Sequence, residues 1–103
     1  MNKKLSKRDE KILQITFAES ELKKQGISGF VELKYDDKIY IGQVKVDPNT
    51  KKEIPNGVGF IVWNDGSHYE GEFLNGKQHG TGEFESTSGK ITKGIWKNGD
   101  FLK

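Results

Sequence analysis

The first part of the chain has the pattern of an amphipathic helix. Residues 7–25 contain neither glycine nor proline, and their apolar positions recur at helical spacing. Ser6 is placed to cap the helix, Asp9 and Glu10 suit its first turn, and Gly26 suits its end. The broad apolar face comprises Ile12, Leu13, Ile15, Phe17, Ala18 and Leu22.

From Gly29 onward the pattern changes to short alternating segments separated by turn residues. Asn-Gly and Asp-Gly pairs between such segments indicate hairpins, because both residues tolerate positive φ angles. The predicted strand pairs are 30–35 with 38–46, 58–63 with 67–74, and 82–85 with 90–97, with 47–56 as a loop and 100–103 as a further strand. We therefore predict an α+β fold, mainly β, with one helix and an antiparallel meander of about six or seven short strands.

A skeleton of glycine and aromatic residues recurs with a period of 23 residues. The shift takes Gly71 to Gly94, Phe73 to Trp96 and Gly76 to Gly99, and in reverse it takes Gly80 to Gly57 and Gly82 to Gly59. Self-similarity at a fixed period is the signature of a repeat architecture, in which each unit packs on its neighbours.

The skeleton resembles the MORN repeat, whose unit runs Tyr-x-Gly-x-aromatic-x-x-Gly-x-x-x-Gly-x-Gly. The unit that matches throughout contains Tyr69, Gly71, Phe73, Gly76, Gly80 and Gly82. Thr92, Gly94, Trp96 and Gly99 begin a later copy, and an earlier copy begins with Tyr40, Gly42 and Val44 and is completed by Gly57 and Gly59. The earlier copy departs from the pattern because its loop is six residues longer.

This resemblance divides the chain into a helical part, 1–26, and a repeat sheet, 27–103. Within the sheet we expect a half-unit at about 29–39 and units at 40–68, 69–91 and 92–103, the first with a loop insertion at 47–56 and the last truncated.

Alternation along the strands predicts two different faces for the sheet. Tyr69, Gly71 and Phe73 share one face, where rings would lie over bare glycine backbone. The reverse face is apolar near the N-terminal half and acidic further on, at Glu70, Glu72, Glu83 and Glu85. We expect the helix to pack on that apolar part, through Ile12, Leu13, Ile15, Phe17 and Leu22 against Val58, Phe60 and Val62. Docking of the helix on another protein is the alternative.

Composition excludes several classes of function. The chain has 103 residues, a net charge of +2 with mixed signs, and no cysteine. It therefore lacks thiol chemistry and the clustered basic face of a nucleic-acid-binding protein. No apolar run approaches the ~20 residues of a membrane span, and no secretory signal is recognisable. His68 and His79 lack converging ligands, so we expect no metal, no cofactor and no enzymatic activity.

The sequence thus favours a non-enzymatic protein-binding module. The residues expected to contact a partner are the rings of the glycine-bearing face: Tyr40, Tyr69, Phe73, Phe84 and Trp96. An open edge strand could instead pair with a partner or with a second copy as a homodimer. The resemblance implies a scaffold or a small subunit of a cytoskeletal or ciliary assembly, in an intracellular, cytoplasmic setting. It leaves open a phospholipid-surface adaptor and a regulatory subunit of an enzyme on a separate chain.

Overall fold

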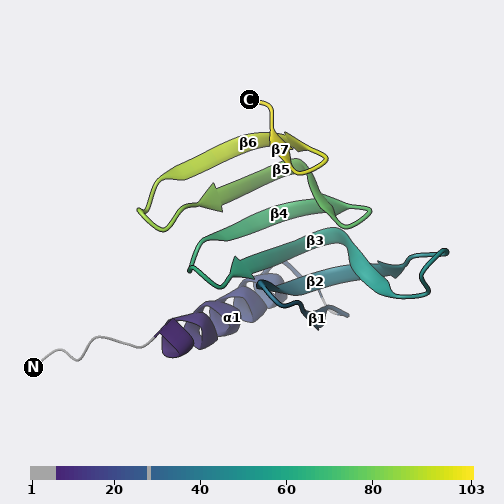
Figure 1. Cartoon of the computed structure of the whole chain (residues 1–103), viewed down its shortest axis with the longest axis horizontal. Helices are drawn as coiled ribbons and strands as arrows, with labels where there is room; N and C mark the ends of the chain where they lie inside the picture. Colours follow the sequence, from purple (N-terminus) through teal and green to yellow (C-terminus); the bar gives the residue numbers. More distant parts are fainter. Residues whose placement is uncertain (1–6, 28) are drawn as a thin grey trace, which may run out of the picture.

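The computed structural model describes residues 7–27 and 29–103, with side chains from residue 15 onward. It contains one helix and a seven-stranded antiparallel sheet with the order β1-β2-β3-β4-β5-β6-β7 (Figure 1). The elements are α1 (Lys7–Lys24), β1 (Val31–Lys34), β2 (Lys38–Val46), β3 (Glu53–Trp63), β4 (His68–Leu74), β5 (Lys77–Glu85), β6 (Ile91–Lys97) and β7 (Asp100–Phe101). The predicted fold class is confirmed.

The predicted loop at 47–56 is shorter in the structure, because β3 already begins at Glu53. Pro55 therefore lies within a strand, where it is buried opposite Val44. The register between β2 and β3 shifts between Gly42 and Val44. Proline is tolerated beside such an irregularity because the ladder there does not require its missing N–H.

The connection after β4 is also shorter than predicted. Asn75 and Gly76 have φ angles of 50° and 89°, which are the positive values of a two-residue hairpin turn. Residues 77–81, expected in a connection, therefore belong to β5. Asn98 and Gly99 repeat the same turn, with φ angles of 50° and 92°.

The helix ends where the sequence predicts. Gly26 has a φ angle of 78°, and its N–H donates to the carbonyl of Lys23 over 3.0 Å. The N–H of Ile27 donates to the carbonyl of Leu22 over 2.9 Å, which completes the Schellman pattern of a left-handed helix end. The expected cap at Ser6 lies outside the described residues.

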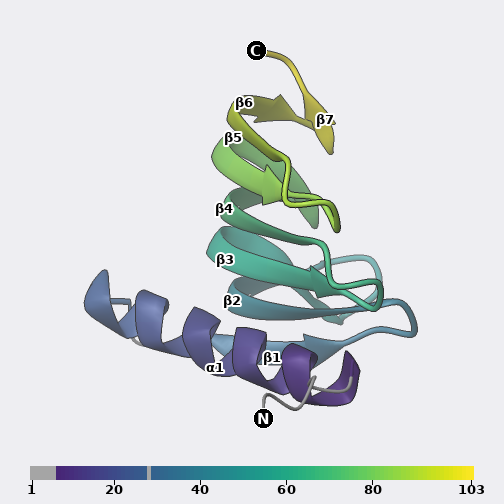
Figure 2. The same cartoon turned by 90° about the vertical axis from the view of Figure 1, so that its left-hand side faces the viewer.

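The helix packs on one face of the sheet at its N-terminal end, and β4–β7 extend beyond it (Figure 2). The contact consists of Ile15, Ala18 and Leu22 on the helix and Ile39, Ile41, Val58 and Phe60 on the sheet. Val62 is buried as well, at 2% exposure. The side chains of Ile12 and Leu13 lie outside the described part of the helix.

Phe17 corrects the predicted packing face, because its side chain is 58% exposed. Residues 15, 18 and 22 follow the i, i+3, i+7 spacing of a single stripe. Phe17 lies about 100° from Ala18 around the helix and so points away from the sheet. Among the described residues, no helix is long and apolar enough to cross a membrane.

Candidate functional site

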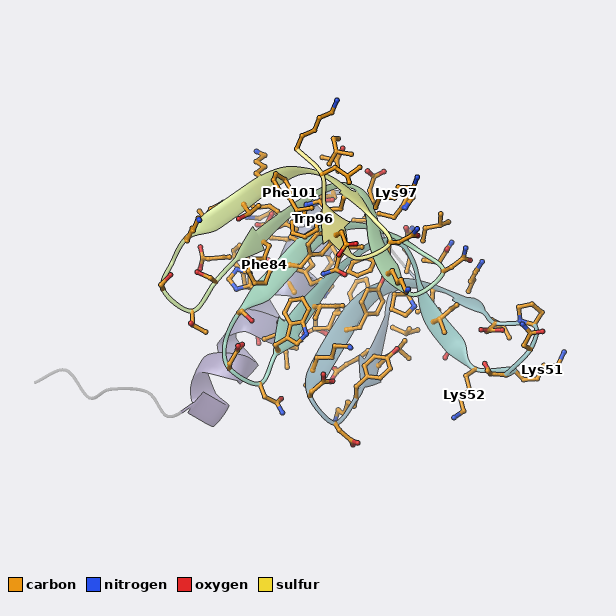
Figure 3. The ribbon with its side chains drawn as sticks, turned by 45° about the horizontal axis from the view of Figure 1, so that its top comes forward. Lys51, Lys52, Phe84, Trp96, Lys97 and Phe101 are labelled. Carbon is orange, nitrogen blue, oxygen red and sulfur yellow. The ribbon has the colours of Figure 1, made fainter. Side chains whose placement is uncertain are left out.

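The face of the sheet opposite the helix carries a continuous ladder of aromatic rings (Figure 3). Ring centroids lie 4.9 Å apart for Tyr40 and Phe73, 5.1 Å for Tyr69 and Phe73, and 5.3 Å for Tyr69 and Trp96. Trp96 in turn meets Phe101 at 5.3 Å. Every one of these contacts is edge-on, the arrangement that aromatic quadrupoles favour. The ladder therefore joins β2, β4, β6 and β7 into one layer.

Two tyrosines lie over glycine backbone in the same way. A side chain at Gly59 would collide with the ring of Tyr40, and one at Gly82 would collide with the ring of Tyr69. The Tyr69 hydroxyl donates to the carbonyl of Glu72 over 2.9 Å, and the Tyr40 hydroxyl makes the equivalent bond to Gln43. Burial raises the pKa of Tyr69 to about 12 and also raises the pKa of Tyr40. Both hydroxyls therefore remain neutral donors at physiological pH.

The hairpin turns repeat along the chain as regularly as the rings do. The N–H of Gly76 donates to the carbonyl of Pro55 over 2.8 Å, and the N–H of Gly99 donates to the carbonyl of Gln78 over 2.9 Å. Both acceptors lie 21 residues before their donors, so each hairpin turn is anchored to the preceding unit in the same way. The aromatic ladder is thus built on hairpins whose turns are held by the same backbone hydrogen bond.

Burial separates the five predicted partner-binding residues into two groups. Tyr40 and Tyr69 are fully buried, and Phe73 and Trp96 are 4% and 7% exposed. These four rings form the protein's own core, so they have almost no surface with which to touch a partner. Only Phe84, which is half-buried, keeps an accessible ring.

Two further rings that contact this layer, Trp63 and Phe101, remain accessible, and sequence reasoning missed both as site residues. Trp63 is half-buried and lies 5.8 Å from Phe84, and Phe101 is 42% exposed. We call Trp63, Phe84 and Phe101 the outer rings. Trp63 follows Gly59 and Ile61 by steps of two, so alternation along β3 was the signal that could have found it.

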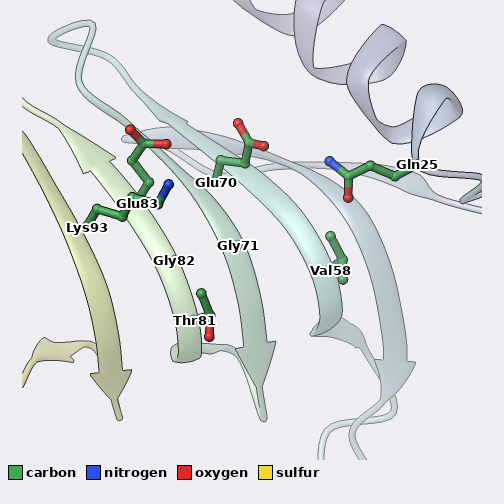
Figure 4. Close-up of a pocket in the computed structure, with 8 residues that line it drawn as sticks. All are labelled: Gln25, Val58, Glu70, Gly71, Thr81, Gly82, Glu83 and Lys93. Carbon is green, nitrogen blue, oxygen red and sulfur yellow. The ribbon is translucent and has the colours of Figure 1, made fainter.

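The reverse face carries a shallow hollow of about 230 Å³ beside the end of the helix (Figure 4). Glu70, Glu83 and Lys93 lie on neighbouring strands at this hollow, and Gln25 and Val58 border it toward the helix. Glu70 is directly opposite Glu83, and Glu83 is directly opposite Lys93. Burial raises the pKa of Glu70, and the negative charges of Glu21 and Glu83 raise it further.

The known MORN repeat pattern matches residues 54–68 and 69–91, which contain Tyr69, Phe73 and the glycines Gly59 and Gly82. Residues 54–91 of the chain therefore contain two MORN repeats. MORN repeats are generally protein-binding or membrane-binding modules.

This MORN chain is also similar to part of a much longer protein. The inactive protein tyrosine kinase pTKL of Plasmodium berghei (strain Anka) is 34% identical over 67 residues, which cover 63% of the present chain and 5% of the kinase-related protein. The MORN chain therefore spans only a small fraction of that relative's length.

The acidic hollow of the MORN sheet predicts a pH-dependent stability. Because the folded state raises the pKa of Glu70 above its ordinary value of 4.5, ionisation of Glu70 disfavours folding. The stability that protonated Glu70 contributes is fully present below about pH 4.5 and is lost as the pH rises through the raised pKa. We expect Glu70→Gln to raise the free energy of unfolding at pH 7 by less than about 1 kcal/mol, since water screens this half-exposed group. Its advantage over the wild type should shrink at pH 4.5.

Thermal melts of both proteins between pH 4.5 and 7 measure the effect. His68 and Lys93, which lower the pKa of Glu70, are unchanged in the variant. A difference in stability that stays constant across this pH range would contradict the assignment.

Among the described residues, neither histidine of the MORN sheet lies in a cluster of metal-ligating side chains. His68 Nε2 lies 3.9 Å from Glu85 Oε2, and the Nδ1 atoms of His68 and His79 are buried without a hydrogen-bond partner among the described residues. No group of three or more histidine or carboxylate side chains in that part of the chain could hold a metal ion.

Proposed function

We propose that this chain is a non-enzymatic protein-binding module, a small structural subunit of a larger assembly of the cytoskeletal or ciliary kind. A segment of the partner lies on the aromatic face, against the outer rings Trp63, Phe84 and Phe101. The observation that carries the proposal is the pairing of these accessible rings with a fully buried layer of rings beneath them.

The buried layer makes the outer rings a rigid platform. Phe84 lies 6.5 Å from Trp96, whose indole N–H donates to the buried carbonyl of Gly82 over 2.9 Å. A ring already held in place loses little side-chain freedom when a partner binds. Large aromatic side chains in such positions are the ones that most often dominate binding energy.

The similarity to the inactive kinase-related protein also supports a modular role. The matched segment forms 5% of that protein, so a stretch of this kind occurs inside a longer polypeptide. Such an occurrence is expected of a module that supplies a binding surface to a larger protein.

Phe84→Ala is the variant that tests the proposal. We expect it to remain folded, since Phe84 is only half-buried, and to lose at least tenfold in the recovery of a bound protein. The tagged chain is used to capture proteins from a native extract, which are then quantified by mass spectrometry. Phe17→Ala is the matched control, because it removes an equally large ring that is 58% exposed on the helix.

Proteins that bind the wild type and Phe17→Ala but not Phe84→Ala support the proposed site. Equal recovery by all three chains would overturn it. Vesicles of anionic phospholipid form a parallel arm, in which we expect no co-sedimentation at physiological salt; sedimentation there would assign the surface to a membrane instead. An enzyme among the lost proteins would make the chain a regulatory subunit bound through the same rings.

A further inference from the structure

We propose that this chain forms a symmetric dimer, in which β1 of one copy pairs antiparallel with β1 of a second copy. β1 is the edge strand of the sheet at the end where the helix packs (Figure 2). The contact uses the backbone and side chains of this edge. It therefore does not depend on the partner proposed for the outer rings.

The outer edge of β1 is open because the chain that leads into it lies on a face of the sheet. The preceding element is α1, which packs over β2 and β3 through Ala18 and Leu22. β1 pairs with β2 on its inner side, and no described residue pairs with its outer side. Such an edge is a template for a further strand.

The backbone of β1 limits how a second copy can pair. The N–H of Tyr35 donates to the carbonyl of Lys38 over 2.9 Å, so the backbone groups of Tyr35 point toward β2. Because these groups alternate along an antiparallel strand, those of Glu32 and Lys34 point to the outer edge. An added strand forms hydrogen bonds only where its own outward residues lie opposite these two. The allowed registers of a second β1 therefore differ by steps of two residues.

Charge selects one of these registers. When Leu33 lies opposite Leu33 of the second copy, Glu32 lies opposite Lys34 on both sides of the two-fold axis. Both charged side chains are exposed in the single chain. One allowed step in either direction places Glu32 opposite Glu32, or Lys34 opposite Lys34. Opposite charges across a strand pair stabilise it and like charges weaken it, so the symmetric register is favoured.

The same register joins apolar side chains on the aromatic face. Leu33 packs against the aromatic ladder and is half-buried, and Tyr35 is 41% exposed. Val31, Leu33 and Tyr35 share this face, because alternate residues of a strand do so. The symmetric register places Leu33 against its own copy and Tyr35 against Val31. Aromatic and β-branched side chains stabilise a sheet when they lie opposite each other.

The edge is selective for its own copy. β1 has only four residues and carries Lys34, and both features usually protect an edge strand from pairing. Glu32 offsets the lysine only when the added strand carries the same two charges in the reverse order. A second β1 in the symmetric register meets this condition, because the two-fold axis reverses the order.

The dimer would place both aromatic faces on one side of a continuous sheet. Residues that lie opposite each other in an antiparallel pair point to the same face, and Leu33 belongs to the aromatic face in both copies. This consequence, unlike the pairing itself, rests on the proposed function. Two linked sets of outer rings would bind a partner with two matching segments more tightly than one set does.

Exchange of the two charges tests the pairing. Sedimentation velocity of the purified chain, from micromolar to millimolar concentration, should show a mass that rises from 11.7 kDa toward twice that value. Glu32→Lys and Lys34→Glu should each weaken dimerisation roughly tenfold, since each places like charges opposite each other twice. The double variant restores opposite charges and should dimerise like the wild type. Glu53→Lys, at an exposed position of β3, changes the net charge as Glu32→Lys does and should leave dimerisation unchanged.

A crosslink tests the register. The chain has no cysteine, so Leu33→Cys introduces a single thiol. In the symmetric register its Cα lies about 4.5 Å from its counterpart, within the range of about 4.4–6.8 Å that a disulfide spans. Val31→Cys is the control on the same face, because its counterpart lies four residues further along the pair, roughly 13 Å away. Under mild oxidation Leu33→Cys should form the crosslinked dimer at least roughly tenfold faster than Val31→Cys.

The proposal is overturned if the wild type remains at 11.7 kDa up to millimolar concentration. It is also overturned if the double charge variant dimerises no better than the single variants, as a contact between β1 and a different strand would require. Equal crosslinking of Leu33→Cys and Val31→Cys would exclude the symmetric register. Circular dichroism of each variant excludes unfolding as the cause of lost dimerisation.

Discussion

Replacing Trp96 with alanine is expected to lower the free energy of unfolding by about 3–5 kcal/mol. The side chain is 7% exposed, and its ring contacts both Tyr69 and Phe101 at 5.3 Å. The substitution removes these contacts, leaves a cavity in the ladder and leaves the buried carbonyl of Gly82 without its 2.9 Å hydrogen bond. Urea denaturation followed by far-UV circular dichroism measures the change.

Phe17→Ala is the control for this prediction, because it deletes a ring of similar size from the surface of the helix. Its expected effect is within about 0.5 kcal/mol. The two variants together test whether the aromatic layer is core. A Trp96→Ala protein that unfolded at the same urea concentration as the wild type would show that the ladder contributes little to stability.

Gly82→Ala is expected to cost about 3 kcal/mol, although it only adds one methyl group. The new methyl would occupy the space of the Tyr69 ring, which is fully buried and cannot move outward without breaking its hydrogen bond to Glu72. The strain therefore passes either to the ring layer or to the backbone of β5. The same denaturation assay measures the loss.

Thr81→Ala provides the neighbouring control, because Thr81 is exposed and the hydrogen bond it makes to Glu72 uses its backbone N–H. We expect a change within about 0.5 kcal/mol. If Gly82→Ala proved as mild as this control, the close approach of Tyr69 to the backbone would not be a constraint on the fold.

Local patterns in the chain were sufficient to predict most of the elements. The helix end at Gly26 and the turns at Asn75 and Asn98 each depend on a few neighbouring residues and their allowed φ angles. The bounds of β3 and β5 were less predictable. Pro55 is acceptable in a strand only because the register shifts beside it, and that shift depends on the partner strand.

The candidate site could be predicted only in part. Alternation correctly placed Tyr69, Phe73 and Trp96 on one face, in one layer of rings. The alternation carries no information on how deeply each side chain is buried, so it did not separate these rings from the accessible Phe84. For the same reason Phe17 entered the predicted helix face, since a wide apolar stripe does not reveal which part of it turns toward the sheet.

The sequence by itself determined the succession of helix and hairpins, the repeat and the assignment of side chains to faces, because each of these follows from the allowed conformations of neighbouring residues. Only the tertiary structure decided which rings are core and which remain accessible. Burial depends on how strands distant in the sequence pack their side chains over one another, and the register shifts at Gly42 and Gly71 set that packing.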